Sequence, residues 1–105
     1  MPWWPRLVEY VEAHLGERIA LDRAAAATGI HPTHLARTVR ARTGATLGDY
    51  VRRRRIARAQ AMLRLEPRRS LARVGFALGF ADHAHFSRTF KAITGLTPRE
   101  FRAIA

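Results

Sequence analysis

Two groups of side chains in this sequence share one spacing and combine small residues with a basic pair. Both follow the i, i+3, i+4, i+7 pattern that places residues on one face of an α-helix. The first group is Thr33, Ala36, Arg37 and Arg40, and the second is Ala84, Ser87, Arg88 and Lys91. Small side chains allow close approach to a groove wall, and a guanidinium can bond two acceptors on one guanine edge. The pattern indicates duplex DNA recognition, although a basic helix face in solvent has the same spacing.

The charge balance indicates a polyanionic partner. Lysine and arginine number 19 against 8 acidic residues, and the formal net charge of the 105-residue chain is +11. Residues 1–22 hold four acids and two arginines, so the positive excess lies entirely in the rest of the chain. Duplex DNA, RNA and anionic membrane surfaces all attract such a charge. An arginine-rich composition is also typical of GC-rich genomes.

The other reactive side chains form no recognisable catalytic or metal site. The chain has no cysteine, which excludes disulfides, zinc–thiolate sites and a cysteine nucleophile. His31 and His34 are three residues apart, whereas His83 and His85 point apart on a helix, and there is no HExxH motif. The acids are scattered rather than paired, and the sequence has no nucleophile elbow or phosphate loop. We therefore expect no enzymatic activity, no cofactor and no metal.

Helical periodicity, helix caps and glycine stops predict an all-α chain of about seven helices. The expected helices begin near residues 5, 21, 32, 47, 71, 83 and 98, and the first six stop at Gly16, Gly29, Gly44, Pro67, Gly79 and Gly95. Thr46, Ser70 and Asp82 are the expected N-caps. Thr97 and Glu100 are spaced as a capping box at the start of the last helix.

The second half of the chain repeats the first. Gly29-Ile30 matches Gly79-Phe80 at an offset of 50, and later positions match at 51. The later matches include Leu35 with Phe86, Arg37 with Arg88, Val39 with Phe90, Arg40 with Lys91 and Gly44 with Gly95. Each copy has the short-helix, tight-turn, helix form of a helix-turn-helix, whose apolar pair faces inward. Two related basic stripes in one chain favour DNA over a merely solvated face.

These residues resemble the DNA-binding domain of the AraC/XylS transcription regulators, over about residues 19–103. The most specific part is GFADHAHFSRTFK at 79–91, followed by GLTPREFR at 95–102. The resemblance implies a bacterial regulator with two helix-turn-helix units joined by a long linker helix. It also implies that the two recognition helices enter adjacent major grooves of duplex DNA.

The resemblance assigns parts and contacts by position. The parts are an N-terminal helix (1–18), a first helix-turn-helix (19–45), the linker helix (46–66) and a second helix-turn-helix with a closing helix (67–105). The expected base-edge contacts are Thr33, Ala36, Arg37, His83, Ala84, Ser87 and Arg88. The expected phosphate contacts are His31, Arg40, Arg42, Arg52 and Lys91. Arg52 opens a run of four arginines that spread over all sides of a helix, so only one or two of them can reach DNA.

The resemblance further implies contact with RNA polymerase and binding to DNA as a monomer, unless a sensor or dimerisation domain lies outside this chain. The chain start does not resemble a signal peptide and no apolar run could span a bilayer, so we expect a cytoplasmic protein of the nucleoid and no membrane partner. The alternative function is a basic protein-interaction module that docks a partner through the helix carrying Trp3 and Trp4. Such a module would bind DNA weakly and without sequence preference.

One departure from the family pattern bears on the second unit. Gly75 stands inside a predicted helix where alanine is usual, at a cost of about 1 kcal/mol in helix propensity. We therefore expect a looser second unit and stronger DNA reading by the first.

Overall fold

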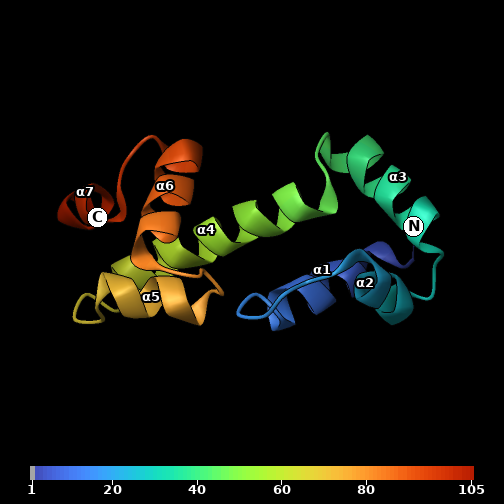
Figure 1. Cartoon of the computed structure of the whole chain (residues 1–105), viewed down its shortest axis with the longest axis horizontal. Coiled ribbons are helices and arrows are strands. Elements are labelled where there is room, and N and C mark those ends of the chain that lie inside the picture. The colour runs from blue at the N-terminus through green and yellow to red at the C-terminus, as the bar shows by residue number, and fades with distance from the viewer. Residues whose placement is uncertain (1) are drawn as a thin grey trace. The chain divides into compact units, whose positions relative to one another are not determined.

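The computed structural model describes residues 2–105, which form seven helices and no strand (Figure 1). The helices are α1 (Trp4–Ala13), α2 (Leu21–Thr28), α3 (Pro32–Thr43), α4 (Leu47–Leu65), α5 (Leu71–Ala77), α6 (His83–Thr94) and α7 (Pro98–Ile104). The all-α class and the number of helices expected from the sequence are confirmed. The helix ends agree with the expected ends to within two residues, except that α1 ends at Ala13, three residues before the expected stop at Gly16.

Side-chain caps begin four of the helices as the sequence predicts. The Thr46 hydroxyl accepts the Asp49 backbone N–H at 3.1 Å, and the Ser70 hydroxyl accepts that of Arg73 at 3.1 Å. At α6 the Asp82 carboxylate accepts the His85 N–H at 2.7 Å. At α7 a full capping box forms between the side chains and backbone amides of Thr97 and Glu100. These contacts satisfy amide groups that the helices leave without partners.

Glycines in the left-handed conformation close the helices that carry the two stripes. Gly44 ends α3 with φ of 75° and Gly95 ends α6 with φ of 85°. Gly29 and Gly79, with φ of 75° and 83°, make the tight turns within the two helix-turn-helix units. A side chain is strained at such angles, which explains why both repeats place glycine at these positions.

The described chain forms two compact units that divide inside α4, between Arg52 and Arg53. The sequence-based boundaries at 18, 45 and 66 remain a prediction about organisation. In the first unit α1 packs on α2 and α2 on α3 (Figure 1). Its core is an apolar cluster: Leu7, Val11, Leu15, Ala24, Ala25, Leu35, Val39, Ala45, Leu47 and Val51.

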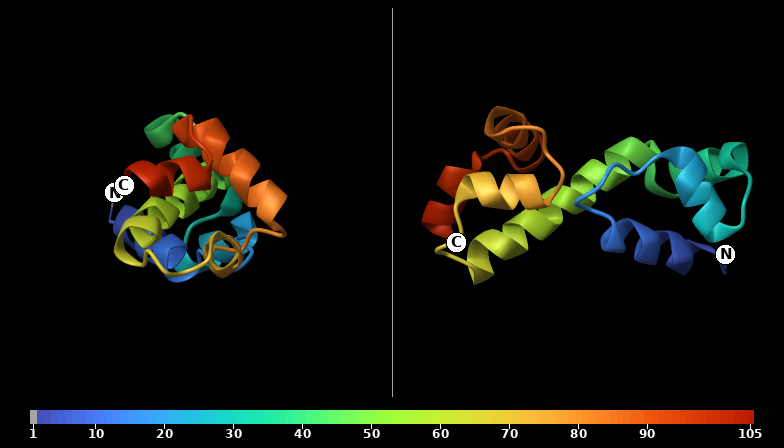
Figure 2. Two further views of the ribbon diagram at one scale, coloured as in Figure 1. Left: turned by 90° about the vertical axis from the view of Figure 1, so that its left-hand side faces the viewer. Right: turned by 60° about the horizontal axis from the view of Figure 1, so that its bottom comes forward.

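The second unit is built on aromatic rings. Phe86 on α6 lies 5.2 Å from Phe80 and 5.8 Å from Phe90, measured between ring centroids. Phe90 in turn lies 5.5 Å from Phe101 of α7 in an edge-to-face arrangement, a geometry that aromatic pairs favour. Figure 2 shows α5, α6 and α7 gathered around the second half of α4, which contributes buried Ile56, Ala59 and Leu63.

Gly75 does not leave a gap in this second unit, and the expected looser second unit and stronger DNA reading by the first remain predictions. An added Cβ on Gly75 would lie 2.8 Å from both Cγ and Cδ2 of Phe86. The equivalent pair in the first unit is Ala25 and Leu35, both buried. A smaller residue on α5 therefore accompanies a larger one on α6, and the ring of Phe86 fills the space that a methyl group would take.

Candidate nucleic-acid interface

The first stripe lies on the outer side of α3. Thr33, Arg37 and Arg40 are exposed and Ala36 is half-buried. On the other side of the helix, Leu35 and Val39 are fully buried in the first unit. Because the buried pair fixes the rotation of α3, the stripe is turned outward as a set. The structure thus brings these four predicted contact residues together on one helix.

The beginning of α3 is capped by a histidine. His31 accepts the backbone N–H of Thr33 through Nδ1 at 3.2 Å, and Pro32 occupies the first turn of the helix. A ring nitrogen that accepts a hydrogen bond carries no proton, so this arrangement assigns the proton of neutral His31 to Nε2. The exposed imidazole can therefore cap α3 and still donate one hydrogen bond outward.

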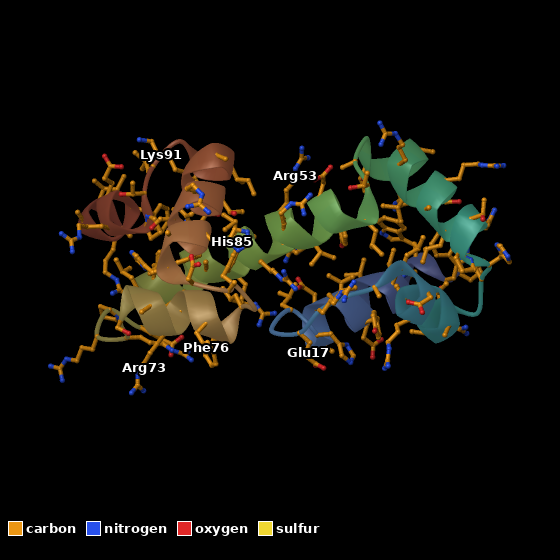
Figure 3. The ribbon with its side chains drawn as sticks, in the orientation of Figure 1. Glu17, Arg53, Arg73, Phe76, His85 and Lys91 are labelled. Atoms are coloured by element: carbon orange, nitrogen blue, oxygen red, sulfur yellow. The ribbon has the colours of Figure 1, made fainter. Side chains whose placement is uncertain are left out.

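The second stripe lies at the equivalent place on α6. Ala84, Arg88 and Lys91 are exposed and Ser87 is half-buried, while Phe86 and Phe90 behind them are fully buried. Figure 3 labels Lys91, which projects from α6. His83 precedes the stripe on an exposed position, and its Nε2 lies 3.4 Å from the Ser87 hydroxyl.

The arginines of the two stripes differ from Arg52 in their contacts. Within residues 2–105 the Arg37, Arg40 and Arg88 guanidiniums form no ion pair and no hydrogen bond with another side chain. Arg52, by contrast, is bound to the Asp49 carboxylate, and this hydrogen bond holds the pKa of Asp49 below its usual range. The stripe guanidiniums are therefore available to a ligand, whereas Arg52 must share its charge.

Arg42 lies on the other side of α3 from the stripe. Because seven residues make about two helical turns, Arg42 falls on the same side as Leu35. Its guanidinium carbon lies 4.5 Å from the centre of the Trp4 ring, a cation–π contact with α1. The expected phosphate contact of Arg42 remains a prediction, and the structure places this side chain against α1.

The two tryptophans at the start of the chain pack against the first unit. The ring centroid of Trp4 lies 6.0 Å from that of Tyr50 on α4, and the centroid of Trp3 lies 6.3 Å from that of His34 on α3. Both tryptophans are half-buried. Sequence reasoning did not find these contacts, because neither residue has a periodic or repeated neighbour that points to α3 or α4.

A hollow beside the first stripe was also not found from the sequence. We call it the α3 recess and define it by its lining residues, Leu21, Ala36, Arg37, Arg40, Thr46, Leu47 and Gly48. These residues come from the first turns of α2 and α4 and from the outer side of α3, all in the first unit. Only the folded arrangement brings the three segments together, so no local sequence pattern predicts it.

The residues that the structure describes contain no group of three or more side chains suited to holding a metal ion. The histidines of each unit instead take part in local contacts, such as the His31 cap and the packing of His85 on Phe80 at 5.3 Å between ring centroids. In the same part of the chain, every helix is too short or too polar to traverse a bilayer.

A family model and several known proteins match the sequence of this chain. A family model described as a helix-turn-helix domain matches residues 24–104. The regulatory protein SoxS of Salmonella typhimurium is 31% identical over 96 residues, which cover 91% of this chain and 89% of SoxS. The putative HTH-type transcriptional regulator YkgA of Escherichia coli is 32% identical over 97 residues. That match covers 92% of this chain and 40% of YkgA, so the chain spans about two fifths of YkgA's length.

A solved structure shares the fold over nearly the whole chain. It is a transcriptional regulator from Chromobacterium violaceum, described as having an AraC-type DNA-binding domain. The two structures match with a TM-score of 0.92 at 30% identity, over 97% of this chain and 90% of the other. The similarity extends beyond the residues matched by the family model, which begin after α1.

Proposed function

This chain belongs to the AraC/XylS-type helix-turn-helix family, and on that premise we propose that it binds a specific duplex DNA sequence and controls transcription. One observation carries the proposal above all. Two equivalent helices, α3 and α6, each have a buried apolar pair behind an exposed stripe of small and basic residues. The names of two relatives, a putative HTH-type transcriptional regulator and a regulatory protein, support the same function.

We assign the base contacts to the residues of the two stripes that can approach the floor of the major groove. Arg37 and Arg88 are exposed and unpartnered within residues 2–105, so each guanidinium can donate two hydrogen bonds to O6 and N7 of a guanine. The small or short side chains beside them allow this approach: Thr33, Ala36, Ala84 and Ser87. His83 adds an imidazole at the start of α6, where it can bond a base edge or the Ser87 hydroxyl.

Phosphate contacts hold the two helices in register on the duplex. We assign them to Arg40 and Lys91 at the far ends of the stripes, to the outward nitrogen of His31, and to Arg52 at the price of its bond to Asp49. These contacts give affinity without sequence information. Each charged contact releases counterions from the DNA on binding, so the observed affinity falls more steeply as the salt concentration rises.

The length of α4 supports a bipartite DNA site. Its 19 residues correspond to about 28 Å at 1.5 Å per residue, close to the roughly 34 Å that separates successive major grooves on one face of the duplex. We propose that one chain places α3 and α6 in successive grooves and covers a non-palindromic site as a monomer. Footprinting that showed only a palindrome bound by an obligate dimer would refute this arrangement.

We also propose that the chain acts on RNA polymerase. A regulator that acts on transcription must change the occupancy or the activity of the polymerase at its promoter. A reconstituted transcription reaction tests this step, because added chain should change transcript yield only from templates that carry its site. Equal yields with and without the site would contradict a role in transcription and leave DNA binding intact.

Salt titration of duplex binding is the first test of the function. With roughly 5–8 phosphate contacts in all, the four assigned above among them, the plot of log affinity against log salt should have a slope of about −5 to −7. Arg40→Ala and Lys91→Ala should each reduce that slope by about one. A scrambled duplex of equal length and composition is the control. Affinity that does not change with salt, or that is equal for both duplexes, would show that the chain is not a sequence-specific DNA-binding protein.

A further inference from the structure

The α3 recess has the dimensions of a small-molecule site. It is an open hollow of about 510 Å³, comparable in volume with ligand pockets of roughly 300–1,000 Å³, and four of its seven lining residues are exposed. It lies in the first unit alone, between the outer side of α3 and the first turns of α2 and α4. The stripe on α6 has no part in it.

The walls of the recess are mostly apolar. Leu47 is 7% exposed and forms part of the core behind the recess, while Leu21 and Ala36 are half-buried beside it. The lining has one side-chain hydroxyl, that of Thr46, which accepts the Asp49 backbone N–H and can still donate one hydrogen bond. A ligand that fills this space must therefore be largely apolar, because the walls offer few polar groups.

The rim of the recess is cationic. Arg37 and Arg40 both line it, and neither guanidinium has a partner within residues 2–105. Asp49, the residue after the lining on α4, is bound by Arg52. Apolar walls below two free guanidiniums complement a molecule with an apolar body and a negative head group.

We propose that the α3 recess binds a small amphipathic organic anion, an aromatic or medium-chain carboxylate. The apolar body lies against Leu47 and Ala36, and the carboxylate bonds Arg37 and Arg40. Because the proposed function gives these two arginines to DNA, ligand and duplex compete for them. The chain thus carries an effector site within its DNA-binding surface, and this competition step rests on the proposed function.

The binding step is tested without DNA by two-dimensional NMR titration of the ¹⁵N-labelled chain with 2-naphthoate. A ligand of this size should bind with a dissociation constant of about 0.1–1 mM. Neutral 2-naphthamide, which has the same shape, should bind about tenfold more weakly, because it lacks the charge that the arginines recognise.

Matched variants locate the site. Ala36→Met fills the recess and should weaken naphthoate binding at least tenfold, whereas Ala41→Met, on an exposed position of α3 outside the lining, should not. Arg40→Gln leaves Arg37 in place and should reduce, but not abolish, the preference for naphthoate over naphthamide, whereas Arg6→Gln at an exposed position of α1 should leave it unchanged. Circular dichroism of each variant verifies that it is folded.

The competition step is tested by fluorescence anisotropy of a labelled duplex. Naphthoate should raise the apparent dissociation constant of the duplex by the factor 1 + [L]/Kd measured in the NMR titration. Recess binding that leaves duplex binding unchanged would overturn the competition. If the duplex binds with its salt dependence but naphthoate does not bind up to about 10 mM, or binds Ala36→Met equally well, the site is wrong and the proposed function stands. Loss of specific duplex binding itself would instead refute the proposed function.

Discussion

Replacing Gly75 with alanine tests the packing between α5 and α6. The new Cβ would lie 2.8 Å from Cγ and Cδ2 of Phe86, well inside the optimal carbon–carbon separation of about 3.5–4.0 Å. Phe86 is fully buried, so its ring cannot swing into solvent. Overpacking costs about 1–3 kcal/mol, whereas alanine gains about 1 kcal/mol over glycine as a helix former. We therefore expect Gly75→Ala to lower the free energy of unfolding by about 1 kcal/mol.

A second substitution should relieve the clash. Phe86→Leu combined with Gly75→Ala recreates the Ala25–Leu35 pair of the first unit, which packs two buried residues at the equivalent positions. Phe86→Leu alone leaves a partial cavity beside Gly75 and should cost about 1–2 kcal/mol. The double variant should be less destabilised than the sum of the two single variants by at least about 1 kcal/mol.

Urea unfolding followed by far-ultraviolet circular dichroism measures these changes. Gly48→Ala is the matched control, because an added Cβ there would lie no closer than 3.6 Å to the nearest atom, Nη1 of Arg52. This control should stabilise the chain by up to about 1 kcal/mol through helix propensity. If Gly75→Ala stabilised the chain as much as Gly48→Ala does, the argument from close packing on Phe86 would be refuted.

Three further outcomes follow from the site and the helix ends. Arg37→Ala and Arg88→Ala should relax base preference in different halves of the DNA site, by about 1–3 kcal/mol each; a randomised-site selection that returned the parent motif for both would contradict their base-reading roles. Arg42→Ala removes the cation–π contact with Trp4 and should cost about 0.5–1 kcal/mol in thermal stability; if Arg42 also makes its expected phosphate contact, the salt slope of DNA binding should fall by about one, and an unchanged slope would contradict that contact. The Thr97 backbone N–H and hydroxyl hold the pKa of Glu100 below its ordinary value. The charged carboxylate therefore stabilises α7 above about pH 4.3, and this contribution is lost as the pH falls through the lowered pKa. Thermal melts of Glu100→Gln should show a smaller loss of stability than the parent chain between about pH 5 and pH 3, and equal losses would argue against the capping box as the cause.

Features set by residues close together in the chain were predicted well from the sequence. The caps at Thr46, Ser70 and Asp82 depend on an amide three residues away, so their sequence pattern and their geometry are nearly the same thing. The expected end of α1 was less accurate. The helix ends at Ala13 while buried Leu15 continues the apolar stripe beyond it, because the following turn returns that side chain to the core.

Features that depend on distant residues were not predictable in the same way. Gly75 is a costly residue by helix propensity, and only the fold shows that Phe86 lies against it. The sequence does not distinguish Arg42 from the other basic residues of α3, and only the fold shows its contact with the ring of Trp4, which lies far earlier in the chain. The faces of α3 and α6 follow from their own periodicity, so the two stripes could be predicted as sets. Which of their members touch bases remains a prediction, since the DNA itself decides it.

The aromatic residues are divided between the two units by type. Trp3, Trp4, Tyr10 and Tyr50 all precede the boundary in α4, and all five phenylalanines follow it. Intrinsic fluorescence excited at the tryptophan band therefore reports on the first unit alone. The sharp near-ultraviolet dichroism of phenylalanine reports on the second. Optical melting of the unlabelled chain can thus show whether the two units unfold together or one before the other.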